Sequence, residues 1–258
     1  LEAKYFVLLL PLAFAGMLAG SRIRTRVACA AVFAAGLGAL VLTFSRGGLI
    51  AGLLAVGVLP FILARRRLLR RGTLALLLVG GLTAAAFALP FLASYFGSRP
   101  GFAHTRLDHL RYGLQILAQH PFIGVGMNNF NAYVPAVAFD GTFAGSPIHI
   151  HYLRVAIETG LPGALLHFGF FFWIIALAYR TTAARDPFVA TVAAALLAAL
   201  VGIAVYWSDD LFYDPIVRTQ TWVIAALVLV LRRLPADPGS EARLEPALAL
   251  RGDSACAY

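Results

Sequence analysis

Histidine and arginine side chains gather in one polar stretch of an otherwise apolar chain, between residues 104 and 163. This stretch holds five of the six histidines, and the sixth, His167, follows four residues later. An imidazole near its ordinary pKa can accept a proton, and guanidinium groups bind phosphate oxygens through paired hydrogen bonds. These groups suit transfer from a lipid diphosphate donor, in which a base takes the proton of an acceptor hydroxyl and cations stabilise the leaving group.

Two histidines, His149 and His151, lie where this stretch returns to an apolar run. On an extended segment their side chains share a face, whereas at the start of a helix they point apart. A His-x-His pair can bind a metal ion, but no nearby Cys, Asp or Glu completes a ligand set, so a metal site is the weaker alternative. A hydrogen-bonded structural histidine near the membrane interface is the other alternative.

Three arginines are candidates for binding phosphate. Arg46 stands between Ser45 and two glycines at the end of an apolar run, and Arg106 and Arg111 flank an expected amphipathic helix. Each has a simpler explanation: Arg46 can extend to lipid headgroups, and the other two can attract anionic lipid. The functional alternative is a guanidinium that binds phosphate oxygens in a bidentate fork.

Glu158 lies within an apolar segment, where an unpaired carboxylate is costly. Arg154, one helical turn earlier, is the expected partner. We therefore expect Glu158 to support the site through an ion pair that stabilises its helix.

The composition predicts an all-α polytopic membrane protein. Apolar residues make up 60% of the 258 residues and charged residues only 13%, against about one quarter charged in soluble domains. A net charge of +9 would suit nucleic acid, but the arginines stand at the ends of apolar runs, as the positive-inside rule expects. The expected partner is therefore the lipid bilayer and no nucleic acid. Cys29 and Cys256 give no disulfide prediction.

About seven membrane spans fit this length. We expect four spans in residues 1–94, a large periplasmic loop over 95–150, three spans in 151–233, and a disordered cytoplasmic tail over 234–258. The loop contains amphipathic helices, of which residues 105–119 form one along the membrane surface. A break at residues 160–163 divides the run 151–179 into a short outer helix and a full span. Fourteen of the 21 Lys and Arg residues then lie inside. The chain does not begin with Met, so we expect an N-terminally truncated chain.

Three motifs together resemble the superfamily of O-antigen ligases and O-antigen polymerases, bacterial envelope enzymes that also include protein O-oligosaccharyltransferases. The first is residues 43–48, TFSRGG, similar to the family's Ser-Arg-Gly at the outer end of a span. The second is Arg106 followed by residues 120–130, HPFIGVGMNNF, similar to an Arg and then Pro-x-x-Gly-x-Gly. The third is residues 149–163, HIHYLRVAIETGLPG, similar to His-Asn-x-x-Leu and then Glu-x-Gly-x-x-Gly, with Ile150 in place of the usual Asn.

The resemblance implies transfer of a glycan from an undecaprenyl-diphosphate-linked donor to an acceptor hydroxyl, at the outer face of the bacterial inner membrane. The acceptor would be a glycolipid, a glycan or a protein, and neither a metal nor another cofactor would be required. His149 matches the family's essential histidine, and Arg46 and Arg106 would hold the diphosphate. His151, Arg111 and Glu158 are supporting candidates.

A membrane transporter is the alternative from another class. Transporters place polar residues near the middle of the membrane in broken helices, often in repeated halves. Here the polar residues cluster towards one side and no repeat is visible, so the glycan transferase is favoured.

Overall fold

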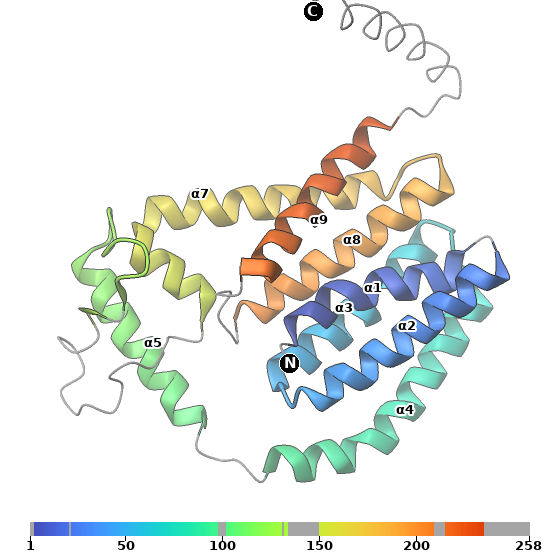
Figure 1. Cartoon of the computed structure of the whole chain (residues 1–258), viewed down its shortest axis with the longest axis horizontal. Coiled ribbons are helices and arrows are strands. Elements are labelled where there is room, and N and C mark those ends of the chain that lie inside the picture. Colours follow the sequence, from blue (N-terminus) through green and yellow to red (C-terminus); the bar gives the residue numbers. More distant parts are fainter. Residues whose placement is uncertain are drawn as a thin grey trace, which may run out of the picture.

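The computed structural model describes residues 3–20, 22–97, 102–130, 132–133, 150–208 and 215–234, and the regular structure among them is helical. The helices of these segments are, in chain order, α1 (Lys4–Ala19), α2 (Ile23–Leu42), α3 (Arg46–Arg65), α4 (Arg71–Gly97), α5 (Phe102–Gln119), α7 (His151–Thr181), α8 (Pro187–Tyr206) and α9 (Pro215–Arg233) (Figure 1). The predicted all-helical class is confirmed for this part of the chain.

Four of these helices, α2, α3, α7 and α8, are long and apolar enough to cross a membrane. α1 and the first half of α4 are apolar but shorter. The protein is therefore a polytopic membrane protein, while the count of about seven spans stays a prediction. Most of the expected loop's second half, residues 134–149, and the tail 235–258 lie outside the described residues.

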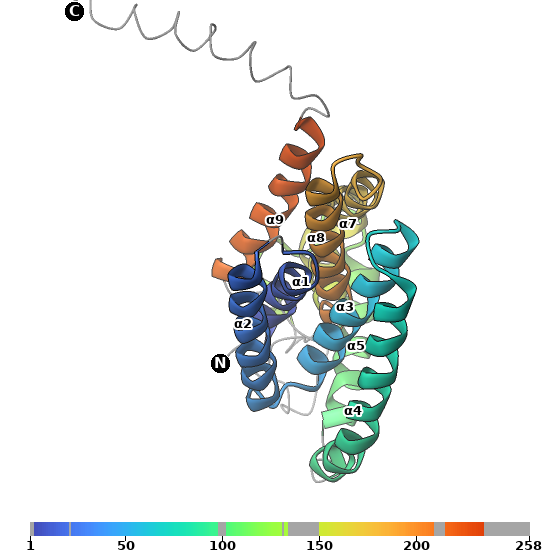
Figure 2. The ribbon, with the colours of Figure 1, turned by 90° about the vertical axis from the view of Figure 1, so that its right-hand side faces the viewer.

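Helix α8 forms the centre of the bundle because small side chains line most of its length and are buried. α1, α3, α7 and α9 pack around it (Figures 1 and 2). A close approach occurs at Gly202, where an added Cβ would lie 2.7 Å from the Cβ of Ala55 and 2.8 Å from a methyl group of Val7. Small residues at such crossings let helices associate tightly in lipid.

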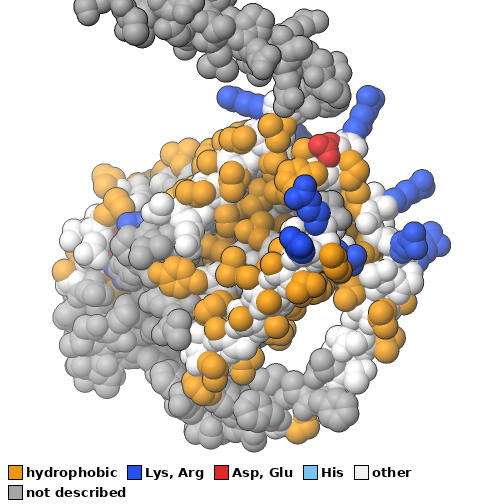
Figure 3. All heavy atoms as spheres, turned by 45° about the vertical axis from the view of Figure 1, so that its right-hand side comes forward, with side chains coloured by type: hydrophobic (Ala, Val, Ile, Leu, Met, Phe, Trp, Pro, Cys, Tyr) orange, Lys and Arg blue, Asp and Glu red, His pale blue; other side chains and the backbone are white. Residues whose placement is uncertain are grey.

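The outside of the bundle is apolar, and the basic side chains lie at its margin. Large apolar side chains such as Leu76 and Leu166 are 72% and 76% exposed, as lipid-facing residues are. Figure 3 shows apolar side chains over the helices, with most of the visible Lys and Arg in the upper and right-hand parts of the view. Exposure of this extent fits a bilayer as the solvent.

One end of the bundle is rich in arginine, and we call it the arginine-rich end. It contains the ends of α1, α3, α7 and α9 and the starts of α2, α4 and α8, with Arg22, Arg24, Arg26, Arg65, Arg66, Arg67, Arg70, Arg71, Arg180, Arg185, Arg232 and Arg233. Arg66 Nε donates a hydrogen bond to Thr182 Oγ1 at 2.9 Å, which ties the end of α3 to the end of α7. These twelve arginines are the members of the predicted inside set that the structure describes. Their grouping at one end of the bundle agrees with that prediction.

α7 consists of two arms joined at Gly160. Gly160 has φ 71° and ψ 174°, a conformation outside the helical region, so residues 151–159 and 161–181 run in different directions (Figure 1). The predicted break is confirmed. The first arm corresponds to the predicted short helix, and the second arm is long enough to form the span.

α5 packs against the first arm of α7. Ile116 of α5 and Leu153 and Ile157 of α7 are buried in one apolar cluster. In the predicted apolar stripe of this helix, Leu117 packs against that cluster, whereas Leu110 and Leu114 are 37% and 50% exposed. The predicted helix is confirmed, and its position along a membrane surface stays a prediction.

Candidate active site

Three backbone hydrogen bonds join two glycine-containing segments, residues 121–126 and residues 157–161. The N–H groups of Val125, Gly126 and Leu161 donate to the carbonyl oxygens of Ile157, Glu158 and Pro121 at 2.9, 3.0 and 2.7 Å. The turn that follows α5 is thereby fixed against the kink of α7. Two motifs that lie more than thirty residues apart in the sequence form one structural unit.

Glycine is required on both sides of this contact. Gly124 and Gly160 have φ values of 72° and 71°, in the region that favours glycine. A Cβ at position 124 would lie 2.5 Å from the backbone nitrogen of Gly160 and 2.6 Å from the carbonyl oxygen of Ile157. A Cβ at position 160 would overlap the carbonyl group of Phe122. We call this contact the glycine docking.

The loop after the glycine docking holds the side chain of Arg154. Arg154 is only 2% exposed, and its Nε donates to Glu158 Oε1 at 2.5 Å, so the predicted ion pair is confirmed. Its Nη2 donates to Asn128 Oδ1 at 3.4 Å, and its guanidinium carbon lies 5.2 Å from the centre of the Phe130 ring. A buried arginine held by a carboxylate, an amide and an aromatic ring is fixed in direction.

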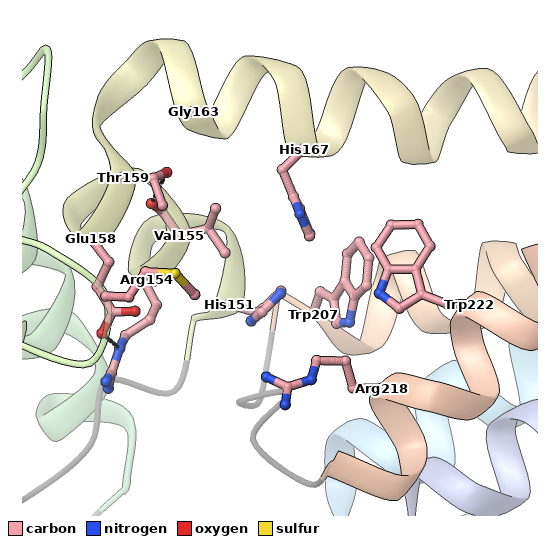
Figure 4. Close-up of a pocket in the computed structure, with 11 residues that line it drawn as sticks. His151, Arg154, Val155, Glu158, Thr159, Gly163, His167, Trp207, Arg218 and Trp222 are labelled. Atoms are coloured by element: carbon pink, nitrogen blue, oxygen red, sulfur yellow. Dashed lines mark hydrogen bonds and ion pairs between the residues drawn. The ribbon is translucent and has the colours of Figure 1, made fainter.

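A cavity of about 380 Å³ lies beneath the kink of α7, at the end of the bundle opposite the arginine-rich end. Both arms of α7, the end of α8 and the first turns of α9 form its walls (Figure 4). Its polar lining consists of His151, Arg154, Glu158, Thr159, His167 and Arg218. Trp207 and Trp222 form much of its apolar wall.

His151 lies between the charged side and the aromatic side of this cavity (Figure 4). Its backbone N–H donates to the carbonyl oxygen of Trp207 at 2.9 Å, and the centres of the two rings are 5.0 Å apart. The start of α7 is thus fixed to the end of α8. The ring of His151 faces the cavity and not the lipid.

The predicted site residues divide into three groups. His151 and Glu158 line the cavity. Arg46 begins α3, where Ser45 Oγ accepts a hydrogen bond from the N–H of Gly48 at 3.1 Å, and Arg111 is exposed on α5; neither is among the described residues that line the cavity. His149 and the side chain of Arg106 lie outside the described residues, so their predicted roles stay predictions.

Sequence reasoning missed most of the cavity. It recorded Arg154 only as the partner of Glu158, and it assigned no role to His167, Arg218 or the tryptophans. His167 carried a usable signal, because an ionisable residue within an apolar run is a functional candidate by default. Arg218 carried a weaker one, because the predicted topology places it on the outer side, where basic residues are fewer.

A protein-family model described as O-antigen ligase matches residues 30–168, which is more than half of the chain. The matched segment contains both halves of the glycine docking and both histidines that line the cavity. No curated protein matches the chain.

Proposed function

Because the chain belongs to the O-antigen ligase family, we propose that it transfers a glycan from an undecaprenyl-diphosphate-linked donor to an acceptor hydroxyl at the outer face of the bacterial inner membrane. The family implies an enzyme of the glycan-transferring type. The chemical identity of the donor, the class of acceptor and the side of the membrane go beyond the family match and are our proposal. The cavity beneath the α7 kink is the proposed active site.

The observation that carries the proposal is the convergence of His151, Arg154 and Arg218 in one cavity beside the glycine docking. Imidazole and guanidinium groups in a partly enclosed space suit a reaction that moves a proton and releases a diphosphate. The cavity lies among helix ends on the side opposite the arginine-rich end, whereas transporter sites lie near the middle of the membrane. This placement favours chemistry at the outer face.

In the proposed reaction, the acceptor hydroxyl oxygen attacks the anomeric carbon of the donor glycan. Its proton passes to His149, which acts as the general base. The bond between the anomeric carbon and the diphosphate oxygen breaks, and undecaprenyl diphosphate leaves with the bonding electrons. Arg218, which lines the cavity, provides a guanidinium against the developing charge, while Arg46 and Arg106 stay predicted ligands of the diphosphate from the motifs alone.

The test is an assay of purified protein with a lipid-linked glycan and three candidate acceptors: a lipid A core, a second lipid-linked glycan and a protein. Identification of the product separates ligase, polymerase and protein-transferase activity. Transfer to none of the three by a folded, membrane-inserted protein would contradict the proposal.

The matched variants are His149→Ala and His120→Ala. The first should lower the rate by about 10²–10⁴-fold, as removal of a general base does. The second should leave the rate near wild type, because His120 packs against Tyr133 and is not among the described residues that line the cavity. If His149→Ala stays active and His151→Ala does not, the base is His151.

A further inference from the structure

The cavity has an aromatic half that the proposed chemistry does not use. It consists of His167 on the second arm of α7, Trp207 after α8 and Trp222 on α9, with the ring of His151 at its edge (Figure 4). The centre of the His167 ring lies 5.8 Å from that of Trp222 and 6.2 Å from those of Trp207 and His151. Trp207 is only 1% exposed and backs the wall, whereas Trp222 keeps part of its surface accessible.

His167 brings a polar atom into this half. Its Nε2 is buried and has no hydrogen-bond partner among the residues that the structure describes. A buried polar atom without a partner costs about 1–3 kcal/mol, so such atoms usually bind a ligand or a water molecule. Phe168 packs edge-on against the same ring, with centres 4.9 Å apart, which restricts its orientation. The His167 ring is therefore restricted in orientation while its Nε2 has no partner among the described residues.

The two halves of the cavity suit different parts of a ligand. Phosphate oxygens would bind the half that contains Arg154 and Arg218. A hydrocarbon tail in the aromatic half would leave His167 Nε2 without a hydrogen bond. A sugar ring satisfies both features of the aromatic half, because its C–H face packs against an indole and its hydroxyl groups bond to an imidazole nitrogen.

We propose that the aromatic half binds one sugar ring of the glycan substrate, stacked on Trp222 and hydrogen-bonded through a hydroxyl group to His167 Nε2. This assignment rests on the proposed function, since it takes the ligand to be a glycan. The sugar belongs either to the donor or to the acceptor. His167 and Trp222 then determine which sugar is accepted and do not take part in bond breaking.

The experiment measures binding without catalysis. Equilibrium dialysis of the purified protein uses three radiolabelled probes: the donor glycan cut from its lipid, the acceptor saccharide without its lipid, and undecaprenyl diphosphate without sugar. The variants are His167→Ala, His167→Gln, Trp222→Leu and the control Trp173→Leu, which removes a half-exposed indole of α7 that is not among the described residues lining the cavity. Size-exclusion profiles and melting temperatures establish folding.

His167→Ala and Trp222→Leu should each weaken binding of one saccharide by about tenfold, which corresponds to about 1.4 kcal/mol. His167→Gln should restore part of it because an amide can replace the hydrogen bond. Trp173→Leu should match wild type, and binding of undecaprenyl diphosphate should not change in any variant. Weaker binding of the donor glycan in these variants assigns the sugar site to the donor. Weaker binding of the acceptor saccharide assigns it to the acceptor.

Unchanged saccharide binding in His167→Ala and Trp222→Leu would overturn the proposal, and so would an equal loss of undecaprenyl diphosphate binding. If His167→Ala does not fold, the same criteria apply to His167→Gln and Trp222→Leu. The outcome is separate from that of the transfer assay. If saccharide binding depends on His167 but the protein transfers no glycan, the proposed function is refuted and the sugar site is supported. If the protein transfers glycan normally but saccharide binding is unchanged in the variants, the proposed function is supported and the sugar site is refuted.

Discussion

Replacing Gly160 by alanine should undo the glycine docking. Alanine at φ 71° and ψ 174° is strained by about 1–3 kcal/mol, and its Cβ would also lie 2.5 Å from the carbonyl carbon of Phe122, which belongs to the backbone and cannot rotate away. The three hydrogen bonds of the docking contribute about 0.5–1.5 kcal/mol each, so about 1.5–4.5 kcal/mol together. The strain alone is of the same order as the contribution of the three hydrogen bonds, and the overlap with Phe122 adds to it.

The assay compares melting temperature and transfer rate in Gly160→Ala and Gly169→Ala. Both glycines lie in α7, but a Cβ at position 169 meets nothing within 4 Å, so the second substitution should leave both quantities near wild type. At about tenfold per 1.4 kcal/mol, a net cost of about 3 kcal/mol lowers the docked population by about 100-fold relative to the undocked one. The transfer rate should fall in Gly160→Ala while the protein still inserts.

The double variant Gly124→Ala/Gly160→Ala provides a second check. Because both substitutions break the same contact, their effects on stability should be smaller together than the sum of the single effects. Additive effects, or a Gly160→Ala protein with normal stability and activity, would refute the docking as the support of the site.

Three further predictions concern the ion pair, the phosphate contact and the topology. Glu158→Gln should lower the melting temperature strongly, because it leaves the buried guanidinium of Arg154 without its carboxylate, a loss of about 3–5 kcal/mol; an unchanged melting temperature would contradict the burial. Arg46→Lys should reduce transfer although the charge is kept, since an ammonium does not form a bidentate fork; full activity would make Arg46 a membrane anchor. A cysteine at Gly101 should react with an impermeant reagent from outside and one at Gly72 should not, and the reverse pattern would invert the topology.

The parts of the fold that sequence predicted are local. The break at Gly160 followed from a Gly-Leu-Pro-Gly run, and the ion pair of Arg154 and Glu158 followed from spacing of one helical turn. The helix over 105–119 followed from the spacing of its leucines. Each of these signals is contained within a few turns of chain, where backbone geometry alone decides which side chains are neighbours.

The cavity could not be predicted in the same way because its walls come from separate helices. Trp207, Arg218 and Trp222 stand forty or more residues after Thr159, and periodicity does not show which faces of α8 and α9 turn towards the kink. The glycine docking had a signal in its two motifs, since each glycine implied a close approach or an unusual φ. The sequence did not show that these two motifs contact each other.

The family match covers only part of the residues that line the cavity. The match ends at residue 168, within the second arm of α7, so it covers the glycine docking and both cavity histidines but not Trp207, Arg218 or Trp222. The three hydrogen bonds of the docking join backbone groups of residues 121–126 and 157–161 and involve no side chain of α8 or α9. The proposed roles therefore cross the end of the match: the proposed sugar site joins His167 of the matched segment to Trp222 beyond it, and Arg218, proposed to face the diphosphate, also lies beyond it.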